Sequence, residues 1–224
     1  MSVTCRSADT RAEMRNKVII SKDAGEELKA YLEGKAQVIV FGGISTVAEP
    51  IRNHPDLVYC RLTEDAIFLG NEQLLTPEYP GDIIYNGFST GKYFIHDLRH
   101  TDGQLLKAVE ELKLIPVNVK QGYACCSIVP VDEDSIITAD RGIARAAEAA
   151  GIKVLTVEAG HVELPGYDTG SLGGTSGRVG DEILFNGDVS AHPDFDTIRE
   201  FIESRGLRIK YFESYPLRDI GSII

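Results

Sequence analysis

One structural unit recurs along this sequence, and that recurrence restricts the fold more than any other feature. Residues 135–157 have the pattern of a short apolar strand, an aspartate, an Ala-rich helix that ends near Gly151, and a second apolar strand. The same order recurs over residues 18–41, 93–119 and 183–212. The aspartate can cap the helix that follows it, because its carboxylate accepts backbone N–H groups. Repetition of this kind predicts a repeat architecture.

The aspartates that end the first strand of each unit set the spacing of the repeat. They are Asp23, Asp97, Asp140 and Asp188, so successive members lie 74, 43 and 48 residues apart. The wide first gap contains AIFLGN, which ends at Asn71 and has the pattern of a fifth copy without its helix. The sequence therefore predicts five units.

A further extended stretch precedes each copy except the first. These stretches cover residues 57–62, 83–86, 126–131 and 175–179, and short acidic or Gly turns follow them. The unit is therefore strand, strand, helix, strand. The first copy lacks a leading strand, whereas the chain ends in the apolar segment RDIGSII. We expect this C-terminal segment to complete the first unit and close a ring that exposes no sheet edge between units.

Five ββαβ units with pseudo-fivefold symmetry resemble the pentein propeller of the guanidine-modifying enzymes, such as arginine deiminase, dimethylarginine dimethylaminohydrolase and the amidinotransferases. The runs GYACCSIVPVDEDSIITADRGIARAA, GYDTGSLGGTSG and DIGSII look most like an uncharacterised bacterial branch of that superfamily. The resemblance implies an α/β fold in which residues 1–224 form a single pentein-like domain. It also implies that the start of each leading strand faces one axial cavity.

The repeat spacing predicts which residues face that cavity. Positions fifteen residues before Asn71, Asp97, Asp140 and Asp188 hold Asp56, Asp82, Cys125 and Gly173. His54 lies two residues before Asp56, and Asp219 starts the corresponding C-terminal segment. A one-residue slip of the hairpin would place Cys126 in the cavity in place of Cys125, because adjacent strand residues face opposite sides. The sequence leaves that choice open.

These residue types suit chemistry on a guanidinium or amidinium group. Asp56 and Asp82 can each accept two parallel N–H bonds from such a cation. A thiolate of Cys125 or Cys126 can attack its central carbon, and His54 can protonate the leaving nitrogen and then activate water. His54-Pro55-Asp56 resembles the H-x-D segment of the hydrolytic penteins. The resemblance thus implies a Cys-dependent hydrolase or transferase that acts on a C–N bond.

Other candidates have weaker support. The nucleophilic cysteine of the well-known penteins lies in the last unit, where this chain has Gly173, Gly174 and Ser176. Those residues either offer backbone N–H groups to an anion or permit close packing. The Gly-rich connection EAGHVELPGYDTG adds His161 as a catalytic candidate and Asp168 as a binding candidate.

The remaining cysteines and histidines have ordinary structural interpretations. Either cysteine of the pair can also be a plain core residue, and Cys5 and Cys60 are expected to be structural. His192 is expected to start a helix, and we expect His96 and His100 on the solvated surface.

Composition limits the partners. The net charge of −11 argues against nucleic acid and anionic membranes and favours a small cationic or amidine-like ligand. The sequence has no apolar leader, no long apolar run and no CxxC or Cys/His ladder, so we expect a cytoplasmic protein with reduced cysteines, no metal and no cofactor. A non-catalytic binding protein, either for a small ligand or similar to the ribosome anti-association factor that shares the pentein fold, is the alternative function. Oligomeric state stays open, a homodimer included.

Overall fold

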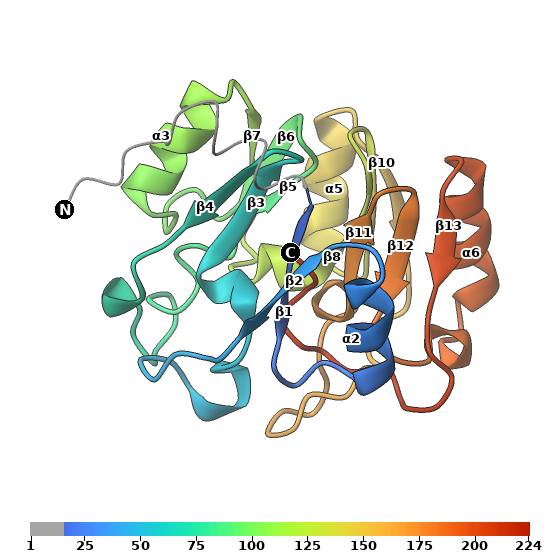
Figure 1. Cartoon of the computed structure of the whole chain (residues 1–224). Coiled ribbons are helices and arrows are strands. Elements are labelled where there is room, and N and C mark those ends of the chain that lie inside the picture. Colours follow the sequence, from blue (N-terminus) through green and yellow to red (C-terminus); the bar gives the residue numbers. More distant parts are fainter. Residues whose placement is uncertain (1–15) are drawn as a thin grey trace.

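The computed structural model describes residues 16–224; the polar N-terminal stretch, with Cys5, lies outside the described residues. This part of the chain is a mixed α/β protein built from small, separate sheets (Figure 1). The first sheet pairs β1 (Lys17–Ser21) in parallel with β2 (Gln37–Phe41), and α2 (Glu26–Glu33) connects them. The second pairs β3 (Tyr59–Thr63) with antiparallel β4 (Ala66–Leu69). Within residues 16–224, no helix is both long and apolar enough to cross a membrane.

The other three sheets share one connectivity, in which an antiparallel pair is followed by a helix and a parallel third strand. The strands and helices of these sheets, in chain order, are β5 (Phe88–Ser89), β6 (Tyr93–His96), α3 (Gly103–Glu111), β7 (Ile115–Asn118), β8 (Ile128–Asp132), β9 (Ser135–Thr138), α5 (Arg141–Ala149), β10 (Lys153–Thr156), β11 (Ser176–Val179), β12 (Glu182–Phe185), α6 (Phe195–Ser204) and β13 (Arg208–Lys210). The predicted strand, strand, helix, strand order is therefore present in these three units. In the second unit the 3-10 helix η3 (Glu72–Leu74) follows β4 where the others have a helix.

Two of the predicted leading strands differ from the structure in a way that matters for the site. Residues 83–86 form a turn, in which the Asn86 N–H donates to the Ile83 carbonyl at 2.8 Å, and the strand begins later, at Phe88. Residues 124–127 form a single helical turn, α4 (Ala124–Ser127), and β8 begins only at Ile128. In both places the local hydrogen bonds of a turn replace the extended backbone that the apolar pattern predicted.

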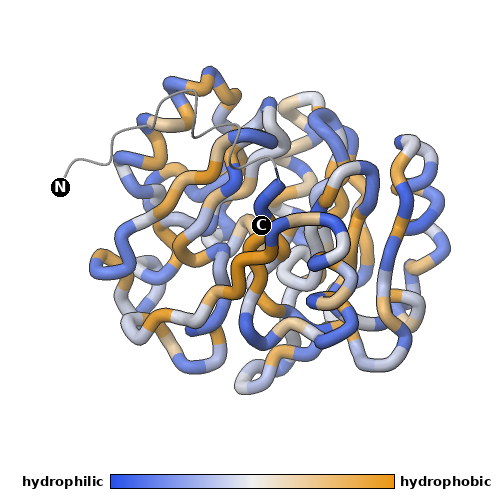
Figure 2. Tube along the Cα trace, viewed as in Figure 1, coloured by the Kyte–Doolittle hydropathy of each residue, from blue (hydrophilic) through white to orange (hydrophobic). Residues whose placement is uncertain are grey.

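The helices pack on the sheets through side chains spaced four residues apart, which lie on one helix face. α2 buries Leu28 and Leu32, and α6 buries Ile198 and Ile202. Figure 2 shows hydrophobic residues along the strands near the centre of the view and more hydrophilic ones along α6 at its edge. The buried positions of α2 and α6 are thus apolar.

The aspartate that ends the first strand of a unit was predicted to cap the next helix, and among α2, α3, α5 and α6 it does so only in α5. The Asp140 carboxylate accepts the N–H groups of Gly142 and Ile143 at the start of α5. Asp97 instead binds nearby side chains, and Asp102 caps α3. The N-cap of α2 is Gly25 rather than Asp23, and Asp188 caps the short 3-10 helix η5 (Val189–Ala191) ahead of α6.

The C-terminal segment lies at the centre of the molecule, where the C-terminus is drawn in Figure 1. The backbones of Ile19 and Ile224 exchange two hydrogen bonds, at 2.7 and 3.0 Å. On the other side, the Ile223 N–H donates to Ser176 at 2.8 Å and the Ser222 N–H donates to Gly174 at 2.8 Å. The last segment of the chain therefore joins the first sheet to the fifth.

Candidate functional site

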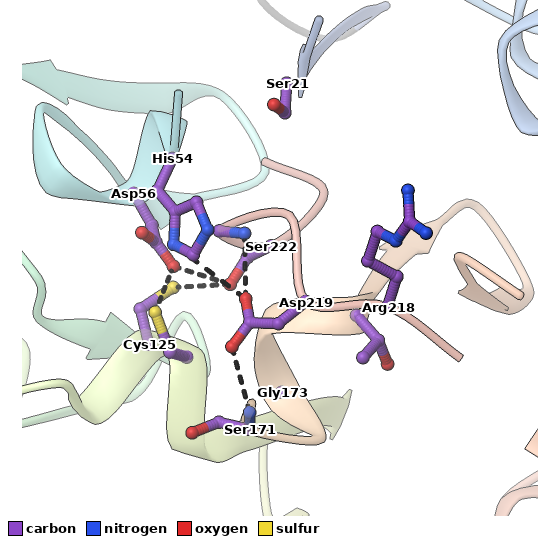
Figure 3. A network of polar contacts seen from close by, with 12 residues as sticks. Ser21, His54, Asp56, Cys125, Ser171, Gly173, Arg218, Asp219 and Ser222 are labelled. Atoms are coloured by element: carbon purple, nitrogen blue, oxygen red, sulfur yellow. Dashed lines mark hydrogen bonds and ion pairs between the residues drawn. The ribbon is translucent and has the colours of Figure 1, made fainter. Parts of the chain in front are cut away.

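Three segments far apart in the sequence meet in a buried polar cluster (Figure 3). They are the 3-10 helix η2 (Pro55–Leu57) with the residue before it, the α4 turn, and the C-terminal segment. We use the name polar cluster for His54, Asp56, Cys125, Cys126, Asp219 and Ser222. None of these residues is more than 8% exposed.

Asp56 lies at the centre of the polar cluster. Its Oδ2 accepts hydrogen bonds from the Cys126 thiol, with Sγ at 2.9 Å, and from the Ser222 hydroxyl at 2.8 Å. Its Oδ1 is buried and has no hydrogen-bond partner among the described residues. Burial raises the pKa of the Asp56 carboxyl above its usual value, although His54 and the two donors oppose this shift. One carboxylate oxygen is therefore free to receive a donor or a cation.

Both cysteines of the pair reach the polar cluster from one helical turn. The Cys125 Sγ lies 3.6 Å from the Ser222 hydroxyl oxygen, whereas the Cys126 Sγ faces Asp56. Burial raises the pKa of both thiols well above the usual value, and the nearby Asp56 carboxylate raises it further. The strand-register argument for choosing between them was wrong, because successive residues of a helical turn do not alternate between two faces as strand residues do.

His54 and Asp219 face each other at the other end of the polar cluster. His54 Nδ1 lies 3.8 Å from Asp219 Oδ1, and both side chains are buried. The backbone N–H groups of Gly221 and Ser171 donate to the two carboxylate oxygens of Asp219, at 3.0 and 2.9 Å. Asp219 is therefore fixed in place and can orient the imidazole.

Asp82 lies on the approach to α4, outside the hydrogen bonds of the polar cluster. It is 3% exposed, and its Oδ2 accepts a hydrogen bond from the hydroxyl of Tyr123, the residue just before α4. Its Oδ1 is buried without a partner among residues 16–224. Burial and the Asp82 carboxylate raise the pKa of Tyr123, which keeps its hydroxyl proton as the donor.

The predicted Gly-rich residues support the polar cluster through close packing. They form the 3-10 helix η4 (Gly173–Thr175) and the start of β11. A Cβ added to Gly173 would lie 2.5 Å from the Cys126 carbonyl oxygen, and one added to Gly174 would overlap the Asp219 carboxylate. The Ser176 hydroxyl donates to the Gly173 carbonyl at 3.0 Å. Of the two interpretations of this segment, the structure favours close approach.

His161 and Asp168 belong to the loop whose Glu163 and Ser171 contact Asp219, but their own side chains have other surroundings. His161 Nε2 is 3.1 Å from a Glu158 carboxylate oxygen, and its ring packs against that of His192 with 5.4 Å between centroids. Asp168 is exposed. Within residues 16–224, no hydrogen bond or ion pair joins either candidate to the polar cluster.

The structure corrects the surface position expected for His96, and it supports the structural roles expected for His192 and Cys60. His96 is fully buried, not on the surface, because Thr101 Oγ1 lies 2.7 Å from Nδ1 and the Gly122 carbonyl oxygen lies 2.9 Å from Nε2. Burial lowers its pKa to about 4. His192 lies just ahead of α6, as predicted, and the Cys60 thiol donates to the Gly87 carbonyl at 3.1 Å as an ordinary core residue.

A cavity of about 80 Å³ reaches the polar cluster. Cys125 and Ser222 belong both to its lining and to the polar cluster. The rest of the lining comes from β3, β5, β8, β11 and the C-terminal segment, and includes Arg61, Ser89, Pro130, Arg178 and Ile224. The leading strands of four sheets and the last segment of the chain therefore converge on one small space beside the thiols.

Asn86 and Ser222 are site residues that the sequence did not indicate. The Asn86 side chain accepts the Cys125 N–H at 3.0 Å and donates to the Asp56 carbonyl at 3.3 Å, so it holds η2 against α4. Each is a lone polar side chain in a short apolar run, IIYNGF or IGSII, and that pattern is the signal from which it could have been predicted.

The polar cluster also contains potential metal ligands. His54, Asp56 and Cys126 each offer one ligand atom, and these atoms lie within 4.8 Å of one another. All three residues are buried.

Comparison with known proteins gives a family without an assigned activity. A family model described as a family of unknown function, DUF6873, matches residues 19–224. No curated protein and no solved structure matches the chain. The matched range begins within β1 and includes every member of the polar cluster.

Proposed function

The chain belongs to the DUF6873 family of unknown function, and we propose that it is a Cys-dependent enzyme of the guanidine-modifying type that cleaves a C–N bond of a small guanidinium or amidinium compound. The observation that carries this proposal is the Cys126 thiol, 2.9 Å from Asp56 Oδ2 among buried carboxyl groups. No Lys or Arg of residues 16–224 forms an ion pair with Asp56, Asp82 or Asp219. Buried carboxylates without Lys or Arg partners favour a cationic ligand.

Two unpartnered oxygens support the orientation of such a ligand. Asp56 Oδ1 and Asp82 Oδ1 are both buried without hydrogen-bond partners in the described part of the chain. The N–H groups of a guanidinium or amidinium ion are planar and in matched pairs, so they suit carboxylate acceptors. In the proposed complex these two oxygens receive donors from the ligand.

The proposed reaction begins with ligand binding, because both thiols are held in the protonated form by burial. The Cys126 thiol passes its proton to Asp56 Oδ2, and the bound cation stabilises the thiolate that remains. The sulfur then attacks the central carbon, the C–N bond breaks, and the departing amine takes a proton from His54. Water, deprotonated by His54, attacks the same carbon and breaks the C–S bond, which releases the product, and Asp56 returns its proton to the sulfur.

We also propose that the five units form the pentein propeller that the repeat predicts. The convergence of β3, β5, β8, β11 and the C-terminal segment on one cavity supports this arrangement. The elements that precede four of these strands, η2, the turn at Asn86, α4 and η4, all contribute to the polar cluster or contact it.

A matched pair of reagents tests the proposed chemistry. We expect chloroacetamidine, a cation, to alkylate Cys126 at least tenfold faster than neutral chloroacetamide, with the modified residue identified by peptide mass spectrometry. The Cys60→Ser variant serves as the control and should react as the wild type does. Equal rates for the two reagents would refute a cation-binding thiol site, and modification of Cys125 alone would reassign the nucleophile to the thiol that lines the cavity.

The deep burial of both cysteines favours a second function, binding without turnover. In that case acetamidine should bind in calorimetry and protect the thiols, yet release no ammonia over many hours. Ammonia release at a rate that depends on protein concentration, and that is lost in Cys126→Ser, distinguishes the enzyme from this binding protein.

A further inference from the structure

We infer that His54, Asp56 and Cys126 form a binding site for a thiophilic divalent cation of the zinc class. Bound there, the ion engages the same thiol that the proposed reaction needs, so it acts as an inhibitor. The binding goes beyond the proposed function and does not depend on it, whereas the inhibitory effect rests on that function.

The three side chains have the right chemistry and spacing. Imidazole nitrogen, carboxylate oxygen and thiolate sulfur are the ligand types that zinc takes in proteins, at about 2.0 to 2.3 Å. Two ligand atoms of one tetrahedral zinc ion therefore lie about 3.3 to 3.8 Å apart. The three atoms offered here lie within 4.8 Å of one another. A contraction of about 1 Å in the longest of these separations, by side-chain rotation, would bring all three onto one ion.

The charge of the site also favours a divalent cation. A Cys126 thiolate and an Asp56 carboxylate carry two negative charges, which one such ion neutralises inside the protein. Asp219 adds a third carboxyl group nearby, 3.8 Å from His54 Nδ1. Asp56 Oδ1 is buried with no partner in residues 16–224, so one oxygen of this carboxylate is available to the ion.

Neighbouring residues already orient two of the ligands. The Ser222 hydroxyl donates to Asp56 Oδ2 at 2.8 Å and fixes the carboxylate plane. The Asp219 carboxylate lies 3.8 Å from Nδ1 of His54, on the side of the ring that leaves Nε2 for the ion. Closing of this gap to hydrogen-bond distance on metal binding would give the carboxylate–histidine–metal arrangement of known zinc sites. The three protein ligands leave one position of a tetrahedral ion for water or a small molecule.

Binding involves no redox step. The S–H bond of Cys126 breaks, its proton leaves to solvent, and a sulfur–metal bond replaces the hydrogen bond to Asp56. The sequence did not indicate this site, and no metal was predicted from it, because the cysteine ligand lies 70 residues from the His54-Pro55-Asp56 segment.

The test uses the full chain treated with a chelator and then dialysed. We expect it to take up one equivalent of Zn²⁺ in competition with a chromophoric chelator. Co²⁺ at the same site should give a sulfur-to-cobalt charge-transfer band in the near ultraviolet. Cys126→Ser and His54→Gln should each weaken Zn²⁺ binding more than about a hundredfold, beyond the typical effect of losing an outer partner. Cys60→Ser and His100→Gln are the matched controls and should bind as the wild type does.

A second measurement uses the wild type alone, so it does not depend on the folding of any variant. One equivalent of Zn²⁺ should slow the alkylation of Cys126 at least tenfold, with the site again identified by mass. Absence of Zn²⁺ uptake by the wild type, or unchanged uptake by folded Cys126→Ser, would overturn the inference. Zn²⁺ uptake without any preference for chloroacetamidine would support the metal site and refute the proposed function. A preference for chloroacetamidine without Zn²⁺ uptake would refute the metal site and support the proposed function.

Discussion

Replacement of Gly173 by alanine tests whether close packing against α4 positions the thiols. A Cβ at this residue would lie 2.5 Å from the Cys126 carbonyl oxygen and 2.6 Å from the Ile128 carbonyl oxygen, and closer still to the Ile128 nitrogen. All three atoms belong to the backbone, so no side-chain rotation relieves the overlap. Ordinary contact begins near 3.4 Å, so this backbone must retreat by about 1 Å.

That displacement sets the expected magnitudes. Overpacking in a buried region costs about 1 to 3 kcal/mol, and a 1 Å shift of the Cys126 sulfur lengthens its 2.9 Å contact with Asp56 beyond hydrogen-bond range. We therefore expect Gly173→Ala to lower the free energy of unfolding by about 2 to 4 kcal/mol. A misplacement of this size also costs about a hundredfold in the rate of a positioned reaction.

The assay is urea unfolding at pH 7, together with the rate of Cys126 alkylation by chloroacetamidine. Gly42→Ala is the matched control, because a Cβ there meets no atom within 4 Å and Gly42 does not have a positive φ. A Gly173→Ala variant within about 0.5 kcal/mol of the wild type, the range of ordinary surface substitutions, would refute the packing argument.

Three further substitutions test other parts of the structure. His96 should destabilise the protein in acid: its pKa falls from 6.5 to about 4 on folding, so the unfolded chain binds the proton first and stability is lost as pH falls below about 6.5. Between pH 7 and pH 5 this amounts to about 2 kcal/mol in urea unfolding, and His96→Gln should lack that dependence. Tyr123→Phe removes the recorded partner of buried Asp82 and should cost about 1 to 3 kcal/mol in the same assay, whereas exposed Tyr79→Phe should cost almost nothing. Asp140→Ala removes a cap that accepts two N–H groups, so its thermal midpoint should fall by an amount that corresponds to about 1 kcal/mol, and Asp140→Asn should restore most of it.

The repeat made much of the fold predictable from the sequence. Helix positions followed from the recurring order of apolar strand, aspartate, helix and strand, and the three complete units have the predicted order of strands and helix. The cap positions were less predictable, because two aspartates precede α3 and two precede α6, and tertiary contacts decide which one binds the backbone. Asp97 illustrates this: Arg99 and His100 bind its carboxylate and leave the helix cap to Asp102.

The fifteen-residue spacing correctly brought some of the site residues together, although the backbone that places them is not the one predicted. Asp56, Cys125 and Gly173 do meet, but on short turns just ahead of the strands rather than on extended backbone. Side-chain direction on such turns depends on their tertiary hydrogen bonds, for example the Asn86 bond to the Cys125 N–H. The sequence pattern therefore located the meeting place without fixing which thiol faces which carboxylate.

The arrangement of the sheets has a consequence for how the protein opens. Each sheet draws its strands from one contiguous stretch of chain, so each has the local contacts of an independent folding unit. The hydrogen bonds that join Asp56 to Cys126 and to Ser222 span 70 and 166 residues, and they cross between those units. Unfolding of any one unit would leave buried polar groups of its neighbours without hydrogen-bond partners. Amide hydrogen exchange is therefore expected to give the same opening free energy in all of the sheets. The polar cluster would then be what couples the unfolding of the separate sheets.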